Sequence, residues 1–206
     1  MSVRCVLLAV VVPLLCLAGC TGGQPAQSVT VAPMWKDEID RTLALNTNLS
    51  DFERQVLSDY VITDAEYAEA QNLFKQCMSD QGWDVTFDAD RRGLNITALG
   101  GSGHTGTVPA DVELGCQTGT LINIQPLYFG MRDNPQGLSN DQLIRACFEK
   151  KSVPDGAGLT DDEFSALVDD MDYVPSSAAA AQCVLDPTGS QGVTEEAAAH
   201  FYGIPE

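Results

Sequence analysis

The side chains that most often carry catalysis are scarce in this chain of 206 residues, which has two histidines, His104 and His200. His104 lies in the glycine-rich stretch 100–106, which has neither the G-x-S-x-G of a nucleophile elbow nor the Gly-Lys-Ser/Thr of a phosphate-binding loop. His200 precedes Phe201 near the chain end, where a packing or surface role is the simpler interpretation. Ser-His-Asp and histidine–metal hydrolysis therefore lack their parts. We expect no catalytic residues, no enzyme, and a flexible loop at 100–106.

Carboxylates are plentiful, with 29 Asp and Glu against 11 Lys and Arg. The stretch 88–93 begins like a calcium loop, but Arg92 and Leu99 stand where an EF-hand needs oxygen ligands. The acidic groups 161–163 and 169–172 offer carboxylates for a hard cation, although such groups more often form a solvated face. We therefore expect no metal or cofactor. A calcium- or small-ligand-binding protein and, less favoured, a carboxylate-based hydrolase of the cell envelope stay as alternatives.

Aromatic and arginine side chains are densest in the stretch 128–135, which reads YFGMRDNP. This composition is typical of protein-binding hot spots. Core aromatics followed by an Asn-Pro turn explain it as simply, and we favour that interpretation.

The N-terminal 20 residues have the composition of an export signal. Arg4 provides a positive start, residues 5–17 are apolar except for Pro13, and the segment ends in Leu-Ala-Gly-Cys at Cys20. The apolar run is shorter than the ~20 residues that span a bilayer. The ending resembles the bacterial lipobox, which implies that residues 1–19 are a signal peptide and that Cys20, acylated through its thiol, becomes the mature N-terminus. Two acyl chains hold a protein at a membrane far more firmly than one.

The charge of the mature chain excludes several partners. Removal of residues 1–19 takes away Arg4 and no acid, so the formal charge falls from −18 to −19. Nucleic acids and anionic head groups are repelled by such a chain, which contains no basic cluster longer than a pair. Residues 21–33 carry no charge and no aromatic side chain, so that residues 20–33 are interpreted as the lipidated cysteine and a flexible tether.

Four cysteines remain in the exported part, namely Cys77, Cys116, Cys147 and Cys183. An even number in an oxidising compartment predicts two disulfides, for which sequence allows three connectivities. We favour Cys77–Cys116 and Cys147–Cys183, because each pair then closes one contiguous half of the chain. Each loop of this size stabilises a fold by about 4 kcal/mol in the chain-entropy model. Metal binding is disfavoured, since the chain has no C-x-x-C pair and no histidine close to these cysteines in sequence.

Helix starts are marked by four S/T-x-x-E/Q capping boxes, which begin at Ser50, Thr63, Ser139 and Thr160. After Thr63 the apolar residues follow helical spacing on one stripe, and the helix after Ser139 repeats the pattern: Tyr67, Ala70, Phe74, Cys77 and Met78, then Leu143, Ile144, Cys147 and Phe148. Cysteines on apolar stripes favour structural disulfides. The similarity of ITDAEYAEA near Ile62 to LTDDEFSAL near Leu159 fits either a duplication or shared capping chemistry.

The period of the pattern changes to two at 83–87 and 94–96, which predicts a β-hairpin with its turn at 88–93. Residues 122–131 are predicted as a helix, with two short helices at 176–185 and 194–202. The predicted fold is α+β, mainly helical with one small β-hairpin and stabilised by two disulfides.

The segment ITDAEYAEAQNLFKQCMSDQGWDVTF, with PLYFGMRDNPQG and RACFEKKSVPDGAGLTDDEF further on, resembles uncharacterised lipoproteins of high-GC Gram-positive (actinobacterial) bacteria. The resemblance covers about residues 50–170, supports the location and fold, and implies no activity. We expect residues 34–206 to form a compact extracytoplasmic domain with halves near 34–135 and 136–206. The expected function is a non-enzymatic binding module on the outer face of the cell membrane, held by Cys20, with a protein or cell-wall partner and no nucleic acid.

Overall fold

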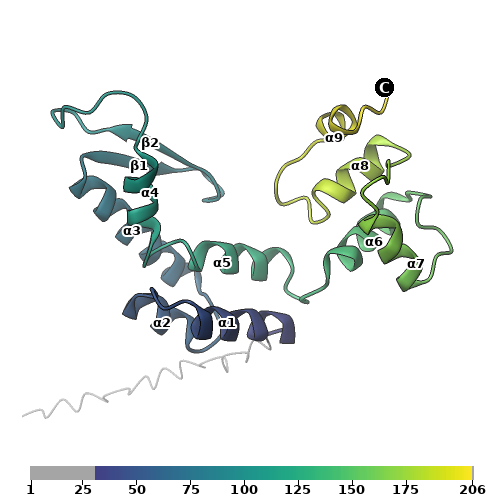
Figure 1. Cartoon of the computed structure of the whole chain (residues 1–206), viewed down its shortest axis with the longest axis horizontal. Helices are drawn as coiled ribbons and strands as arrows, with labels where there is room; N and C mark the ends of the chain where they lie inside the picture. The colour runs from purple at the N-terminus through teal and green to yellow at the C-terminus, as the bar shows by residue number, and fades with distance from the viewer. Residues whose placement is uncertain (1–30, 206) are drawn as a thin grey trace, which may run out of the picture.

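Residues 31–205 are described by a computed structural model, so the predicted signal peptide, Cys20 and most of the tether lie outside the described residues. The described elements follow in this order (Figure 1): α1 (Pro33–Leu45), α2 (Asp51–Leu57), α3 (Asp64–Asp80), β1 (Trp83–Phe87), β2 (Leu94–Ala98), α4 (Ala110–Gln117), α5 (Ile124–Asp133), α6 (Asn140–Lys151), α7 (Asp161–Asp169), α8 (Ala178–Leu185) and α9 (Glu195–Tyr202). The predicted mainly helical α+β class with one hairpin is confirmed. Val31 is buried and Pro33 already belongs to α1, so the expected tether extends no further than residue 30.

All four capping boxes are present, at the starts of α2, α3, α6 and α7. At α2 the Ser50 hydroxyl accepts the Glu53 backbone N–H at 3.1 Å, and Glu53 Oε2 accepts the Ser50 N–H at 3.0 Å. Each box satisfies donors that the first turn of a helix leaves without partners.

Two helices, α1 and α4, were not among the expected elements. Neither has a side-chain cap: α1 starts with Pro33 and α4 follows Pro109. Proline suits the start of a helix because its missing N–H would have no partner there. The signal in α1 was present but weaker, since Trp35, Ile39 and Leu43 recur at helical spacing.

The first hydrophobic core is formed by helices α1, α2, α3, α4 and α5 together with the hairpin. The predicted stripe of α3 is buried, with Tyr67, Phe74 and Met78 fully enclosed. The strands pair antiparallel with Val85 opposite Ile96, and Trp83 and Val85 face the core. This half therefore places the hairpin and α5 against the same long helix.

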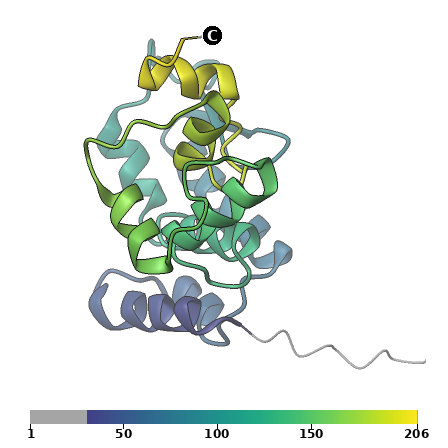
Figure 2. The ribbon, with the colours of Figure 1, turned by 90° about the vertical axis from the view of Figure 1, so that its right-hand side faces the viewer.

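A second core lies within α6, α7 and α8 and contains Ile144, Phe148, Phe164 and Ala180. Figure 1 shows α6–α9 as one arm and the hairpin with α3 as the other, joined near the α5–α6 connection. Figure 2, seen from the C-terminal side, shows α1 and α9 at opposite ends.

Both predicted disulfides are present. Cys77–Cys116 joins α3 to α4 with the Cα atoms 5.5 Å apart, and Cys147–Cys183 joins α6 to α8 at 5.6 Å. Each disulfide belongs to one of the two hydrophobic cores. It therefore crosslinks helices whose apolar faces already pack together.

Helices α3 and α6, which carry Cys77 and Cys147, are each followed by a residue with left-handed backbone. Five residues after Cys77 stands Gly82 with φ +84°, and five residues after Cys147 stands Ser152 with φ +57°. A buried residue follows each one, Trp83 or Val153. A left-handed residue at this position turns the chain back towards the helix and is normally glycine.

Within residues 31–205, every helix is too short or too polar to cross a bilayer.

Candidate functional site

Three aromatic rings pack together where α3 and α5 meet. The rings of Tyr67 and Tyr128 are nearly parallel with centroids 4.1 Å apart, and Phe129 meets Tyr67 edge-on at 5.3 Å. All three side chains are buried. Of the two interpretations of the stretch 128–135, the core role therefore holds for Tyr128 and Phe129.

Three of the ten basic side chains of the described residues gather on these rings. The guanidinium of Arg92 lies 4.2 Å from the centre of Phe129, and that of Arg91 lies 5.4 Å from Tyr67. Arg132 lies 6.0 Å from the ring of Tyr128. We call these residues the arginine–aromatic cluster: Tyr67, Tyr128, Phe129, Arg91, Arg92 and Arg132.

The Tyr128 hydroxyl is the polar centre of the cluster. It donates to Asp64 Oδ1 at 2.5 Å and accepts from Arg132 Nη1 at 2.9 Å and Arg91 Nη2 at 3.1 Å. This hydrogen bond from Tyr128, helped by the charges of Arg91 and Arg132, lowers the pKa of Asp64. Burial and the Asp64 hydrogen bond raise the pKa of Tyr128, and burial raises the pKa of Tyr67 to about 12. The carboxylate therefore stays ionised while both phenols stay neutral at physiological pH.

The hairpin turn 88–93 is held against α5 and α3 by side chains. The Tyr67 hydroxyl donates to the Arg91 carbonyl at 2.8 Å, and Gln125 Nε2 donates to the Arg92 carbonyl at 3.2 Å. Arg92 also pairs with Asp133 at 2.6 Å. Arg91 has φ +62°, a left-handed conformation that tightens the turn. The stretch 88–93 is thus the predicted turn, and it delivers two arginines to the cluster.

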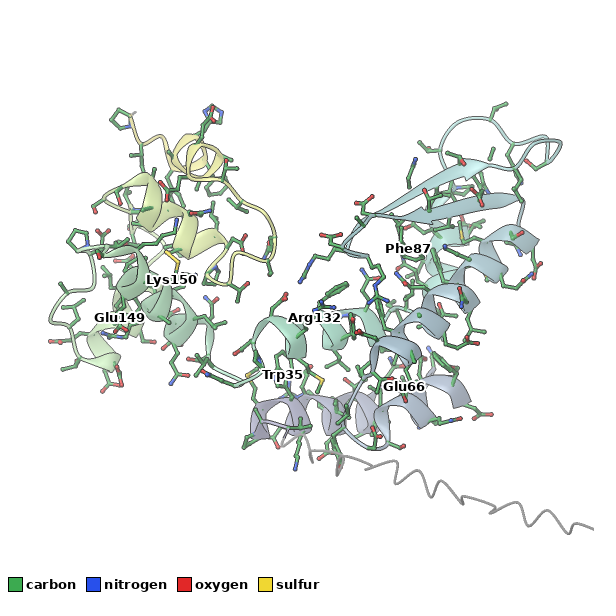
Figure 3. The ribbon with its side chains drawn as sticks, turned by 180° about the vertical axis from the view of Figure 1, so that it is seen from behind. Trp35, Glu66, Phe87, Arg132, Glu149 and Lys150 are labelled. Carbon is green, nitrogen blue, oxygen red and sulfur yellow. A yellow bond between two sulfur atoms is a disulfide. The ribbon has the colours of Figure 1, made fainter. Side chains whose placement is uncertain are left out.

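Two cavities flank the cluster. The turn-side cavity, of about 710 Å³, is lined by Arg92, Phe129, Gln117, Gln125 and, from the loop after α8, Gln191. Its volume lies within the 300–1,000 Å³ typical of small-molecule sites. The second, about 310 Å³, opens on the other side of α5 beside Trp35, Tyr128 and Arg132. Figure 3 shows Trp35 on α1 and Arg132 on α5, which lies next to it. The cluster therefore lies between two cavities, one lined by Arg92 and three glutamines and the other mainly by apolar side chains.

The acidic groups that suggested a cation site are not brought together. Asp161 and Asp162 begin α7 and Asp169 ends it, at opposite ends of a helix of nine residues, about 13 Å long. No group of three or more His, Cys, Asp or Glu side chains within residues 31–205 is arranged to hold a metal ion.

His104 differs from the expectation of a flexible loop. Its ring stacks on Trp83 with centroids 4.9 Å apart, and its Nε2 lies 3.0 Å from the Gln81 carbonyl oxygen. The absence of a side chain at Gly82 makes this contact possible, because a Cβ there would lie 2.9 Å from the imidazole. His200 is exposed on α9, as expected.

Sequence reasoning missed three members of the site: Trp35, Asp64 and the role of Arg91. Asp64 was visible as the first residue of the α3 capping box, but nothing local indicates that it meets Tyr128, which lies 64 residues away. Arg91 and Arg92 were expected within the hairpin turn 88–93, with no indication that they meet α3 and α5. The predicted lipidation site Cys20 lies outside the described residues.

Comparisons with protein-family models, curated proteins and solved structures find no match for this chain.

Proposed function

We propose that the protein is a lipid-anchored extracytoplasmic binding module, held to the outer face of the cell membrane by acylated Cys20, and that it is not an enzyme. Its partner is a protein or cell-wall component, which it recognises at the turn-side cavity. The anchor rests on the Leu-Ala-Gly-Cys ending at Cys20 and on the apolar run before it.

The observation that carries recognition is the lining of the turn-side cavity, to which Arg92, Phe129 and three glutamines contribute. Amide and guanidinium groups donate and accept hydrogen bonds in fixed planes, which suits peptide groups and sugar hydroxyls. Arg92 is held in place by Asp133 and by the face of Phe129, so its position is set before a partner arrives. A preorganised polar side chain loses little entropy on binding.

The distribution of carboxyl pKa values supports binding over hydrolysis. In the described chain, every carboxyl group whose pKa departs from its ordinary value is shifted downwards: Asp64, Asp141, Asp155 and Glu163. A carboxyl that serves as general acid needs a raised pKa, produced by burial or by a second carboxylate.

Mass spectrometry of the membrane-extracted protein tests the anchor. The expected product begins at Cys20 and carries acyl chains. A product that lacks acyl chains, or that begins elsewhere, contradicts the anchor.

Binding to purified cell-wall fragments and to solubilised envelope proteins tests recognition. We expect a double variant, Gln117→Ala with Gln191→Ala, to bind about tenfold more weakly, because each lost hydrogen bond contributes about 0.5–1.5 kcal/mol. Gln55→Ala is the matched control, because Gln55 is exposed on α2 and lies outside the cavity lining. Equal binding by the double variant and the control would show that the cavity is not the recognition site.

A further inference from the structure

The second cavity has apolar walls that end at a charged patch. We call it the Trp35 groove, after the tryptophan on α1 that forms one side of it. Its apolar lining is Val31, Trp35, Val61, Ile62, Met131 and Pro135.

Trp35 is fixed rather than free to fill the groove. Its indole N–H donates to the Asn134 carbonyl at 2.7 Å. The ring also lies against Gly130, where a Cβ would come within 2.6 Å of it. A tryptophan held by a hydrogen bond and by close packing gives a preformed apolar surface.

The polar end of the groove carries one unbalanced positive charge. Arg132, Asp64 and Tyr128 line it, and Arg91 reaches the same Tyr128 hydroxyl from the hairpin turn. The two guanidinium groups face one carboxylate, with nitrogen–oxygen separations of 3.8 and 3.9 Å to Asp64. The Tyr128 hydroxyl already uses its donor and both acceptor positions, so new hydrogen bonds must come from the arginines. Arg132 is more than half exposed and donates one hydrogen bond within the described structure, which leaves most of its five donors for a ligand.

We propose that the Trp35 groove binds a single-chain amphiphile with a monoanionic head group, the acyl chain lying along the apolar walls and the head group on Arg132. The volume of about 310 Å³ is at the lower limit for small-molecule sites, which suits one chain and not a two-chain lipid. The excess of one positive charge selects a monoanion. The rest of the chain, whose net charge is −18, repels polyanions, so the single positive charge at the end of the groove does not attract them.

The distance of the groove from the membrane also agrees with such a ligand. This point alone rests on the proposed anchor. Val31 lines the groove and stands 11 residues after Cys20. An extended chain of that length spans at most about 40 Å, so an anchored groove stays close to the membrane, where single-chain amphiphiles are found.

Titration with three ten-carbon probes tests the proposal: decanoate, decanol and the decyltrimethylammonium ion, each below its aggregation concentration. The protein used begins at Thr21, which removes the predicted signal peptide and lipidation site and keeps both hydrophobic cores and both disulfides. Calorimetry gives the affinity, and tryptophan fluorescence, to which Trp35 and Trp83 both contribute, gives a second measure of binding. We expect decanoate to bind about tenfold more tightly than decanol, as one charge-assisted hydrogen bond provides, and the cation to bind more weakly than either.

Two variants separate the head group from the chain. Arg132→Gln is expected to weaken decanoate about tenfold and to leave decanol unchanged, whereas Ile62→Gln weakens both. Arg54→Gln, which removes the same charge from an exposed position on α2, leaves all affinities unchanged. Circular dichroism confirms that each variant is folded.

Preference for the cation, or unchanged decanoate affinity in Arg132→Gln, overturns the proposal. Sedimentation of the protein with phosphatidylglycerol vesicles in a manner that depends on Arg132 also overturns it, since the groove then recognises a bilayer surface. These outcomes are distinct from failure of the proposed function, which is measured by the mass of the mature protein and by the glutamine variants of the other cavity.

Discussion

Replacing Glu53 with alanine should destabilise the protein far more than replacing Glu66, although both carboxylates close a capping box in the same half of the chain. Glu53 is fully buried, and its two oxygens accept hydrogen bonds from the Ser50 backbone N–H and from Asn123 Nδ2, at 3.0 and 2.9 Å. Glu66 is only partly buried, and its hydrogen bonds go to its own cap residue, Thr63.

The expected difference follows from what each change leaves behind. Glu66→Ala removes one capping interaction at the surface, which costs about 0.5–1 kcal/mol. Glu53→Ala removes the same interaction, leaves the half-buried Asn123 amide without its acceptor at about 1–3 kcal/mol, and opens a small cavity at about 1–2 kcal/mol. The total for Glu53 is about 2.5–6 kcal/mol. Helix propensity and charge at the helix N-terminus change equally in the two variants and cancel.

Urea denaturation of the wild type and both variants measures this difference. Both residues belong to elements that pack on the first hydrophobic core, so we expect one transition to report both. Glu53→Gln preserves the volume but turns an N–H₂ group towards Asn123, and it should lose an intermediate amount. If the losses of unfolding free energy in Glu53→Ala and Glu66→Ala differ by less than about 0.5 kcal/mol, burial of Glu53 does not increase the contribution of its capping box to stability, and the reasoning is wrong.

Three further outcomes are expected. Ser152→Gly should stabilise the protein by about 0.5–1 kcal/mol in thermal or urea unfolding, because Ser152 is exposed and its φ of +57° suits glycine; a loss of stability would contradict the strain. At Asp155, burial alone would raise the pKa, but hydrogen bonds from Ser176 and Tyr173 hold it below its ordinary value. Its stabilisation is therefore present above the unfolded pKa near 4 and is lost as pH falls through the folded pKa, so the stability gap between wild type and Asp155→Asn should shrink below about pH 4; a constant gap would refute this. Burial raises the pKa of Tyr67 to about 12, so its neutral form stabilises the fold up to about pH 10 and the gain is lost towards pH 12. Ultraviolet absorbance should show the Tyr67 phenol titrating late, together with Tyr173, whose pKa is also raised by burial, and a Tyr67→Phe variant should lose part of this late step.

The elements that were predicted correctly are those whose signals are local. The capping boxes join residues three apart, and the hairpin alternation joins neighbours, so both are visible in a short window of sequence. Helices α1 and α4 were missed because proline, and not a polar cap, precedes or begins them. The disulfide pairing was predicted because each pair closes its own half of the chain, 39 and 36 residues apart.

The candidate site could be predicted only in part. The density of aromatic and arginine side chains at 128–135 pointed to the right helix, but not to its partners. Tyr128 meets Asp64 across 64 residues and Arg91 across 37, and Trp35 donates to Asn134 across 99. These contacts have no periodic signature.

The amino-acid sequence by itself determined the four helix starts that have capping boxes, the hairpin and the cysteine count, because hydrogen bonds over one turn and alternation along one strand depend on neighbouring residues. Only the tertiary structure decided that arginines from a hairpin turn and from α5 share one tyrosine hydroxyl, and that a cavity lies on each side of them. The reason is physical: such contacts form only after long loops have closed, and the free energy that closes them comes from burying the apolar faces of α1, α3 and α5 together.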